Sequence, residues 1–383
     1  MRKALVVFWI VTGIFGGIFT GQLWAGEPIR IGLQAPITGS FAIEGQMAKQ
    51  CVELAAELLN KEGGINGRLI EIVVADDASN PRDSALAAQR LISQKVVAAI
   101  ASYGSSVTEP AADLYDRNKV ISVAYGATAV RLTMDKERPY FFRTCGRDDS
   151  QGAFFAKFAV ETMGWKRIAI MHDNQTYGKG VAEETRKYLE PYIQEGRAEI
   201  VYYDAITPGE QDYSAALTKL RESNPDVWYY TAYYPEAGLL VRQGRELGIT
   251  IPFVGSNAVP NDDFVKIAGL EYVVGTLMTQ EPLPQDLDTP KSQAFFEAYR
   301  AKFGEIPSSP WPIYAADALF AVAQAIRNTG STDSDILARE MRAMQNATGI
   351  TGPIYFTERG DRKDIPYAMY RYNEKGQLEL FQP

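Results

Sequence analysis

IASYGSSVTEP at residues 100–110 and VISVAYGAT at residues 120–128 are two apolar runs that each stop in glycine and hydroxyl residues. Residues 95–101, which lead into the first stop, are nearly all apolar, as expected of a strand buried on both faces. Thr108, Glu109 and Pro110 follow, and a hydroxyl before an acidic residue and a proline predicts a helix start. The two runs therefore predict neighbouring strands of a parallel sheet, each followed by a tight turn.

The hydroxyl residues at the ends of these strands indicate an anion site. Ser105 and Ser106 follow the first strand, and the free N–H groups of the next helix turn point to the same place. Gly126 and Thr128 end the second strand and add further backbone groups and a hydroxyl. Open α/β sheets bind ligands at the carboxyl ends of neighbouring strands, so a ligand site is predicted here. The alternative is a pair of ordinary turns with capping hydroxyls, which the spacing alone does not exclude.

The first 25 residues have the pattern of an export signal. Arg2 and Lys3 give a basic start, residues 4–19 are apolar without a charge, and residues 23–25 offer a cleavage site. We therefore predict a cleaved signal peptide over residues 1–25 and a mature protein in the periplasm. The alternative is an uncleaved membrane anchor, because the apolar stretch approaches the ~20 residues that a membrane span needs.

The composition indicates a globular protein with a sizeable core. Of the 383 residues, 46% are hydrophobic and 22% are charged, and the length predicts two or three domains. The net charge of −8 argues against a nucleic-acid partner. Cys51 falls on the apolar face of an expected helix and Cys145 falls in a loop, so both thiols are expected to be free.

Strand and helix patterns alternate from residue 29 onward, which predicts parallel sheets covered by helices. Strands are expected at residues 29–33, 70–75, 95–101, 120–124, 167–171, 198–202, 226–230 and 251–255, with short ones at 354–356, 367–372 and 378–381. Helices are expected from residues 45 and 81 and at 154–163, 180–195, 213–223, 235–247, 292–303, 313–328 and 334–344. The strands are too many for one compact sheet, so we predict two domains.

Residues typical of catalytic centres are few. His172 is the single histidine, and at the end of a buried strand it is expected to be a hydrogen-bonded structural residue. The acidic pairs at residues 76–77 and 148–149 are expected to cap helices or mark turns. The sequence has no Gly-x-Ser-x-Gly elbow, zinc-ligand cluster, Walker loop or dinucleotide-binding glycine motif. Neither enzyme activity nor a metal or other cofactor is therefore expected.

A set of short motifs in a fixed order is more specific than any one spacing. The motifs are residues 29–39, GGINGR at 63–68, DDASNP at 76–81, SSxTxP at 105–110, RT at 143–144, DSQG at 149–152, residues 167–178 and GPI at 352–354. The set resembles the leucine/isoleucine/valine-binding proteins of bacterial ABC transporters, which are type I periplasmic binding proteins. The resemblance covers essentially the whole chain beyond the predicted signal peptide.

The resemblance implies an α/β fold of two Rossmann-like lobes with parallel sheets, joined by three hinge crossings that let the lobes close on a ligand. It places the crossings near residues 147, 279–281 and 352–356. The first lobe would then comprise residues 27–147 and 282–355. The second lobe would comprise residues 148–281 and 356–383.

The resemblance also implies ligand-binding roles by position. Ser105 and Thr128 match residues that bind the α-carboxylate of a ligand, and Gly126 matches a position whose backbone helps to hold its ammonium. Tyr177 and Tyr233 match residues of the second lobe that close over the ligand. These implied roles agree with the anion site described above, because in both cases neutral hydroxyls and N–H groups hold an anion without a buried cation.

Two positions depart from the family pattern. Asn257 stands where amino-acid binders carry a carboxylate for the ammonium, and an amide cannot offset a buried cation as a carboxylate does. Glu44 stands where an aromatic residue is frequent, and it either supplies the missing charge or is a solvated residue near a helix start. Tyr103, Tyr125 and Trp311 map near the pocket and form either an aromatic wall or ordinary packing within the lobe.

We therefore expect the periplasmic substrate-binding component of an ABC importer, a monomer that binds a small molecule between its lobes and delivers it to a membrane permease. An amino acid, apolar or branched-chain, is the leading ligand. The alternative ligand is another carboxylate, such as an aromatic acid, or a short amide. A ligand-sensing receptor domain is a further alternative, although such a domain would carry a membrane or signalling segment. A hydrolase is disfavoured by the poor set of catalytic residues.

Overall fold

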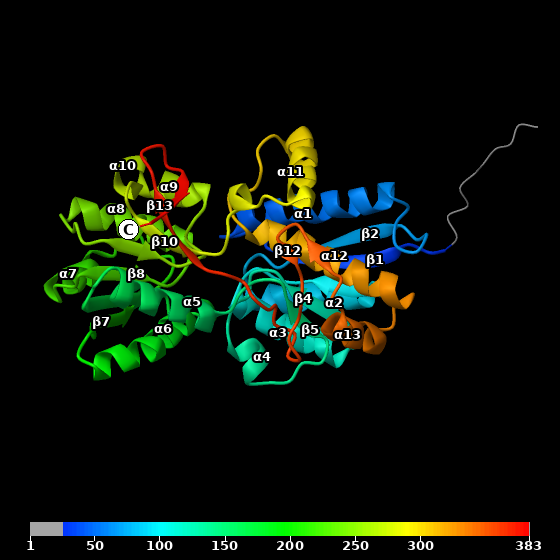
Figure 1. Cartoon of the computed structure of the whole chain (residues 1–383), viewed down its shortest axis with the longest axis horizontal. Helices are drawn as coiled ribbons and strands as arrows, with labels where there is room; N and C mark the ends of the chain where they lie inside the picture. Colours follow the sequence, from blue (N-terminus) through cyan, green and yellow to red (C-terminus); the bar gives the residue numbers. More distant parts are fainter. Residues whose placement is uncertain (1–25, 383) are drawn as a thin grey trace, which may run out of the picture.

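The computed structural model describes residues 26–382, which form two α/β halves side by side (Figure 1). The predicted signal peptide, residues 1–25, lies outside the described residues. Each half is built around its own sheet, with helices packed against it. The chain passes between the halves near the middle of the molecule, where the loops in Figure 1 converge.

The first half contains a five-stranded parallel sheet in the order β2-β1-β3-β4-β5. Its elements are β1 (Ile29–Ala35), α1 (Ala42–Lys61), β2 (Ile70–Asp76), α2 (Pro81–Ser93), β3 (Ala98–Ile100), α3 (Ser105–Arg117), β4 (Ile121–Ala124), α4 (Arg131–Met134) and β5 (Phe141–Arg143). Later segments join this half, namely α11 (Pro290–Phe303), α12 (Trp311–Thr329), α13 (Ser334–Ala343), β11 (Thr348–Gly349) and β12 (Gly352–Pro353).

The second half contains a seven-stranded sheet in the order β14-β13-β10-β9-β8-β6-β7. Its elements are α5 (Asp148–Lys157), η1 (Phe158–Thr162), β6 (Arg167–His172), α6 (Thr176–Gln194), β7 (Glu199–Ala205), α7 (Ser214–Glu222), β8 (Val227–Tyr230), α8 (Tyr234–Glu246), β9 (Phe253–Gly255), α9 (Asp262–Ala268), α10 (Leu270–Val273), β10 (Leu277–Gln280), β13 (Ala368–Tyr372) and β14 (Leu378–Leu380). A short 3₁₀ turn, η2 (Pro284–Asp286), follows β10. Strands β13 and β14 are antiparallel to their neighbours, whereas the other five are parallel.

Both sheets are wound in the same way, and this winding predicts the position of a ligand site. The order β7-β6-β8-β9-β10 in the second half repeats β2-β1-β3-β4-β5 in the first. Such sheets bind ligands at the carboxyl ends of their strands, next to the point where the strand order reverses. The loops after β1, β3 and β4 and the loops after β6, β8 and β9 are therefore the candidate site.

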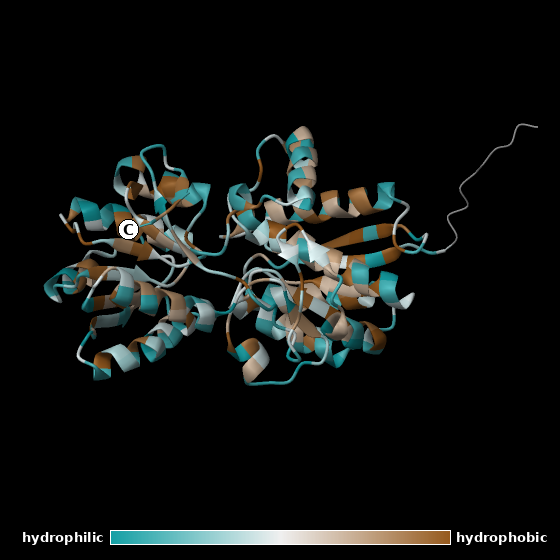
Figure 2. Ribbon diagram, viewed as in Figure 1, coloured by the Kyte–Doolittle hydropathy of each residue, from teal (hydrophilic) through white to brown (hydrophobic). Residues whose placement is uncertain are grey.

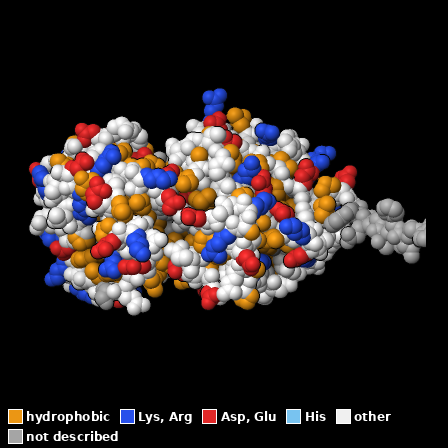
Figure 3. All heavy atoms as spheres, turned by 90° about the horizontal axis from the view of Figure 1, so that it is seen from above, with side chains coloured by type: hydrophobic (Ala, Val, Ile, Leu, Met, Phe, Trp, Pro, Cys, Tyr) orange, Lys and Arg blue, Asp and Glu red, His pale blue; other side chains and the backbone are white. Residues whose placement is uncertain are grey.

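The core of each half lies between its sheet and the covering helices. Strands β3, β4 and β8 are buried along their whole length, as expected of parallel strands covered on both faces. Hydrophobic residues concentrate on the strands and hydrophilic ones on the outer helix faces (Figure 2). Lys and Arg side chains are interspersed with Asp and Glu side chains over the face in Figure 3. The burial pattern confirms the predicted parallel α/β architecture.

The start of α3 differs from the sequence expectation. The helix was expected to begin at Thr108, but it begins at Ser105, and Gly104 is its N-cap residue. The backbone N–H of Thr108 already donates to the carbonyl of Gly104 at 2.9 Å, so the first turn closes before Pro110. Pro110 therefore lies inside the helix, and Ser105 and Ser106 form its first turn.

Three strand expectations were also incomplete or wrong. The sequence patterns did not predict β5 or β10, and the strand expected at residues 354–356 does not form in the described chain. Gly352–Pro353 pairs with Thr348–Gly349 instead, and Phe356 makes an isolated bridge with Arg362. Proline and glycine in this segment favour a short hairpin over a continuous strand.

Both cysteines, Cys51 and Cys145, are free and buried, as the sequence indicated. Burial raises the pKa of both thiols, which makes the reactive thiolate scarce. Among residues 26–382, none of the helices combines the length and the apolar character that a membrane crossing requires.

Candidate functional site

The loops after β3 and β4 bring the predicted anion-binding residues together. Ser105 and Thr128 are both fully buried, and the Ser105 hydroxyl accepts a hydrogen bond from the Ala129 backbone N–H at 3.2 Å. The hydroxyl proton of Ser105 therefore remains available for another acceptor. Within the described chain, the Thr128 hydroxyl has no hydrogen-bond partner. Ser106 lies beside Ser105 on α3 and is half-buried.

A glycine is needed where these two loops meet. A Cβ atom on Gly126 would lie 2.7 Å from the backbone oxygen of Tyr103 and 2.7 Å from its ring. Real Cβ contacts are not that short, so only glycine lets the two loops approach this closely. The backbone N–H of Gly126 donates to the Ser102 carbonyl at 3.3 Å.

A buried arginine holds the second of these loops. Arg143, at the end of β5, donates from Nη1 to the carbonyls of Ala127 and Ala129 at 2.9 and 3.0 Å. Its Nε donates to Asp361 at 2.7 Å, so the cation is paired although it is fully buried. Arg143 thus fixes the backbone on both sides of Thr128. The sequence had shown Arg143 only as part of a family motif, without this role.

Three residues of the second half reach the same region. Tyr177 is the second residue of α6, Tyr233 immediately precedes α8, and Asn257 follows β9. All three side chains are buried. The Tyr233 hydroxyl lies 3.3 Å from the Cβ position of Gly104, next to the start of α3. The rings of Tyr177 and Tyr233 are 5.1 Å apart. The two halves therefore face each other through the predicted residues.

Aromatic residues of both halves pack against one another in this region. Tyr103 packs against Tyr125 and Trp311 with ring centroids 6.4 and 5.9 Å apart, and against Tyr233 of the other half at 6.1 Å. Phe41, which the sequence did not single out, lies 4.5 Å from Tyr233. The hydroxyls of Tyr103 and Tyr125 are buried and unpartnered within residues 26–382.

Glu44 is buried at the contact between the halves, so it is not a solvated residue. Its carboxylate accepts hydrogen bonds from Ser309 at 2.6 Å and from Asn261 of the second half at 3.4 Å. Burial raises the pKa of Glu44 to about 7, and the hydrogen bonds from Ser309 and Asn261 partly oppose this rise. Whether the Glu44 carboxylate contacts a ligand stays a prediction.

Asn257 belongs to a hydrogen-bond network that the sequence did not reveal. Its carbonyl oxygen accepts from the Tyr177 hydroxyl at 2.6 Å, and its amide donates to Glu281 at 2.9 Å. Tyr367 donates to the other oxygen of Glu281 at 3.1 Å. A Cβ on Gly146 would lie 3.0 Å from that same oxygen, so segments around residues 146, 281 and 367 meet at one buried carboxylate.

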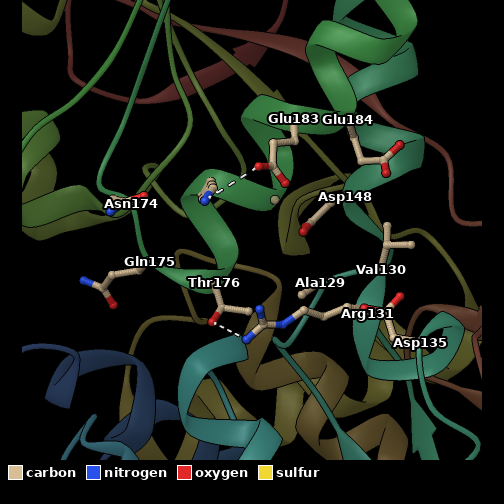
Figure 4. A pocket seen from close by; sticks show the side chains of 12 residues that line it. Ala129, Val130, Arg131, Asp135, Asp148, Asn174, Gln175, Thr176, Glu183 and Glu184 are labelled. Atoms are coloured by element: carbon tan, nitrogen blue, oxygen red, sulfur yellow. Dashed lines mark hydrogen bonds and ion pairs between the residues drawn. The ribbon is translucent and has the colours of Figure 1, made fainter.

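A cavity of about 470 Å³ opens between the halves next to this region (Figure 4). Its lining residues come from the loop after β4, from α4 and α5, and from the start of α6: Ala129, Val130, Arg131, Asp135, Asp148, Asn174, Gln175, Thr176, Lys179, Gly180, Glu183 and Glu184. Arg131 donates to the Thr176 hydroxyl at 3.1 Å across the cavity, which links the halves (Figure 4).

The residues weighed as catalytic groups have structural surroundings. His172 accepts a hydrogen bond from the backbone N–H of Asn174 at 3.0 Å and lies against Tyr203, as expected of a structural histidine. Asp149 is ion-paired with Arg147. Across the described residues, no group of three or more His, Cys, Asp or Glu side chains is placed to hold a metal ion.

Comparisons with known proteins test the family resemblance that the sequence motifs suggested. The model of the periplasmic binding protein family matches residues 28–377. The leucine-, isoleucine-, valine-, threonine- and alanine-binding protein of Pseudomonas aeruginosa is 32% identical over 357 residues, covering 93% of each chain. The leucine-binding protein LivK of Thermotoga maritima superposes with a TM-score of 0.84 at 28% identity, covering 92% of this chain and 98% of that one.

A second solved structure has an amino acid bound. The branched-chain amino acid transporter substrate-binding protein LivJ of Streptococcus pneumoniae, in complex with isoleucine, superposes with a TM-score of 0.83 at 28% identity. The match covers 93% of this chain and all of that one. The resemblance read from the sequence motifs is thereby confirmed: the chain belongs to the periplasmic binding protein family and is a substrate-binding protein similar to the Leu/Ile/Val-binding proteins.

Proposed function

We propose that this protein binds an amino acid, apolar or branched-chain, in the cleft between its halves and delivers it to the membrane permease of an ABC importer. The observation that carries the proposal is the set of buried hydroxyls at this cleft, on Tyr103, Tyr125 and Thr128, that lack a partner within residues 26–382. Buried polar groups are normally hydrogen-bonded, so a group of unpaired hydroxyls near the contact between the halves points to a ligand that pairs with them.

The binding roles follow from the chemistry of each side of the cleft. Ser105 and Thr128 would hold the ligand's carboxylate, the backbone at Gly126 would help to hold its ammonium, and Tyr177 and Tyr233 would close over the ligand. The names of the relatives, which include leucine-, isoleucine- and valine-binding proteins, support an α-amino acid over other carboxylates. As an exported, monomeric carrier, the protein would act in the periplasm without a cofactor or nucleic-acid partner.

We also propose a hinge at the three chain crossings. The first two crossings would lie near residues 147 and 279–281, as the sequence indicated. Gly360 accepts a hydrogen bond from the Arg143 backbone at 2.9 Å, so the chain still lies beside β5 at that residue. We therefore place the third crossing after Arg362, later than the range 352–356. With this change the first lobe would comprise residues 27–147 and 282–362, and the second lobe residues 148–281 and 363–383, in place of the limit between residues 355 and 356 that the sequence led us to expect.

A thermal-shift screen tests the ligand class. Amino acids, aromatic acids and short amides are added separately to the purified protein, and the unfolding temperature is recorded. A specific ligand at 100 times its Kd should stabilise the fold by about 2.7 kcal/mol. A response to aromatic acids or amides but to none of the amino acids would replace the proposed ligand with the alternative class.

Ser105→Ala and Thr128→Ala are each expected to weaken amino-acid binding by about 1.5–3 kcal/mol, because each removes a hydroxyl from a buried charge. Calorimetric titration measures the effect, and circular dichroism checks that the variants fold. Ser93→Ala, which removes an exposed hydroxyl at the end of α2, is the matched control and should bind like the parent. Unchanged affinity in both cleft variants would remove the carboxylate assignment.

A further inference from the structure

Asp148 is a buried carboxylate next to the predicted carboxylate-binding loop. It is the first residue of α5, and its backbone N–H donates to the carbonyl of Thr128 at 3.0 Å, so the two residues are held together. Its side chain is fully buried and lines the cavity between the halves, and its carboxylate points into that cavity in Figure 4.

Both carboxylate oxygens of Asp148 lack a hydrogen-bond partner within residues 26–382. Burial raises the pKa of Asp148 to about 7, and the Thr128 hydroxyl and Arg143 oppose this rise without reaching hydrogen-bond geometry. A buried, unpaired carboxylate is costly, so its presence needs a reason. Most buried polar side chains find a partner within the protein, and this one does not.

The cations around Asp148 are engaged with other groups. Arg143 pairs with Asp361, Arg131 with Glu109, Arg147 with Asp149 and Asp361, and Lys179 lies 3.8 Å from Glu183. The other buried carboxylates of the cleft already have hydrogen-bond donors. Glu44 accepts from Ser309, and Glu281 accepts from Asn257 and Tyr367. Asp148 is therefore the cleft carboxylate best placed to accept a new cation.

The structure leaves space beside this carboxylate. A Cβ atom on Gly180 would lie 2.6 Å from Asp148 Oδ2, so any larger residue on α6 would push the carboxylate aside. Glycine at this position keeps Asp148 open toward the cavity of about 470 Å³. Glu183 and Glu184, which also line the cavity, add negative rather than compensating charge.

We propose that Asp148 binds the positively charged amino group of the ligand. It would take the role of the carboxylate that amino-acid binders carry at the position of Asn257. This inference rests on the proposed function and narrows it to ligands that carry a primary ammonium beside a carboxylate. An ammonium has three donors, which the Asp148 carboxylate, the Thr128 hydroxyl and a backbone carbonyl of the adjoining loop would accept. An acid without an amino group would leave Asp148 unpaired and bind poorly.

Matched pairs of probes separate this role from general damage to the cleft. Leucine, valine and alanine are titrated beside the acids that lack their amino group, 4-methylpentanoate, 3-methylbutanoate and propanoate. The parent protein should bind the preferred amino acid at least about 100-fold more tightly than its partner acid. Asp148→Asn should lower the affinity for the amino acid by about 100-fold. The affinity for the partner acid should stay the same or rise slightly.

Two further variants complete the experiment. Glu183→Gln removes the same charge from an exposed position in the same cavity and should change affinity by less than about threefold. Gly180→Ala should mimic Asp148→Asn, because its Cβ displaces the carboxylate, and it keeps the test valid if Asp148→Asn does not fold. Parent-like amino-acid affinity in the folded variants overturns the role of Asp148. If the parent binds none of the three amino acids, the proposed function fails instead, and this inference fails with it.

Discussion

Asp361→Ala should lower the free energy of unfolding by about 3–5 kcal/mol, because it leaves a fully buried arginine without its counter-ion. Asp361 is 3% exposed and accepts from Arg143 Nε at 2.7 Å and from Arg147 Nη1 at 2.9 Å. It also accepts from the Thr133 hydroxyl. The substitution removes all three acceptor contacts, while Arg143 stays enclosed between β5 and the loop at residues 127–129.

Urea unfolding followed by circular dichroism measures this loss. Glu71→Ala is the control, since it breaks the ion pair with Arg30, in which both side chains are 50% exposed. Exposed pairs of this kind contribute about 0–1 kcal/mol. Equal losses of unfolding free energy in the two variants would show that the buried ion pair stabilises the protein no more than the exposed pair does. Because Arg143 also holds the carbonyls beside Thr128, we expect Asp361→Ala to weaken ligand binding as well.

Glu44→Gln should make the protein more stable than the parent at pH 8, by up to about 3 kcal/mol. Burial raises the pKa of Glu44 from its ordinary value of 4.5 to about 7 in the folded protein. The folded state therefore holds the Glu44 proton more tightly than the unfolded state does. This stabilisation is complete below about pH 4.5 and is lost as the pH rises through about 7, whereas glutamine stays neutral throughout.

Unfolding free energies at pH 4.5, 6 and 8 check this prediction. The parent should lose stability relative to Glu44→Gln over this range, and the two should agree at pH 4.5. Glu53→Gln removes a partly exposed carboxylate from the same helix and should follow the parent curve. Parallel curves for Glu44→Gln and the parent would mean that Glu44 is ionised without penalty. In the titrations above, a large loss of leucine affinity in Glu44→Gln would assign the ammonium to Glu44 rather than to Asp148.

The sequence predicted the alternating fold well because buried parallel strands read as apolar runs. β4 and the helix N-capped by Asn80 were located within a residue or so for this reason. β10 was missed because Thr279 and Gln280 are polar yet fully buried, and their side chains pair with Gln151 and with the Asn257 carbonyl. Such pairing partners lie far away in the chain, so no local pattern reveals them.

In the candidate site, too, local sequence patterns revealed some residues but not their distant partners. The residues that end strands, such as Ser105 and Thr128, were visible because glycine and hydroxyl clusters mark the carboxyl ends of buried runs. The partners that set their environment were not visible. Glu281 reaches Asn257, and Asp361 reaches Arg143, only after the chain has crossed between the halves. Asp148 was expected to cap a helix or to mark a turn, and only the folded structure shows that its carboxylate lacks a partner within residues 26–382.

The pairing of β13 with β10 means that the sheet of the second half can be completed only late in folding. Gln280 pairs with Ala368 and Leu277 with Arg371, and the chain between them builds α11, α12 and α13 of the other half. Until the last residues are available, β10 presents an open strand edge, which can pair with other chains. A long intervening segment also makes this closure slow. Chains truncated before β13 should therefore aggregate through β10, even though the first sheet lacks none of its strands.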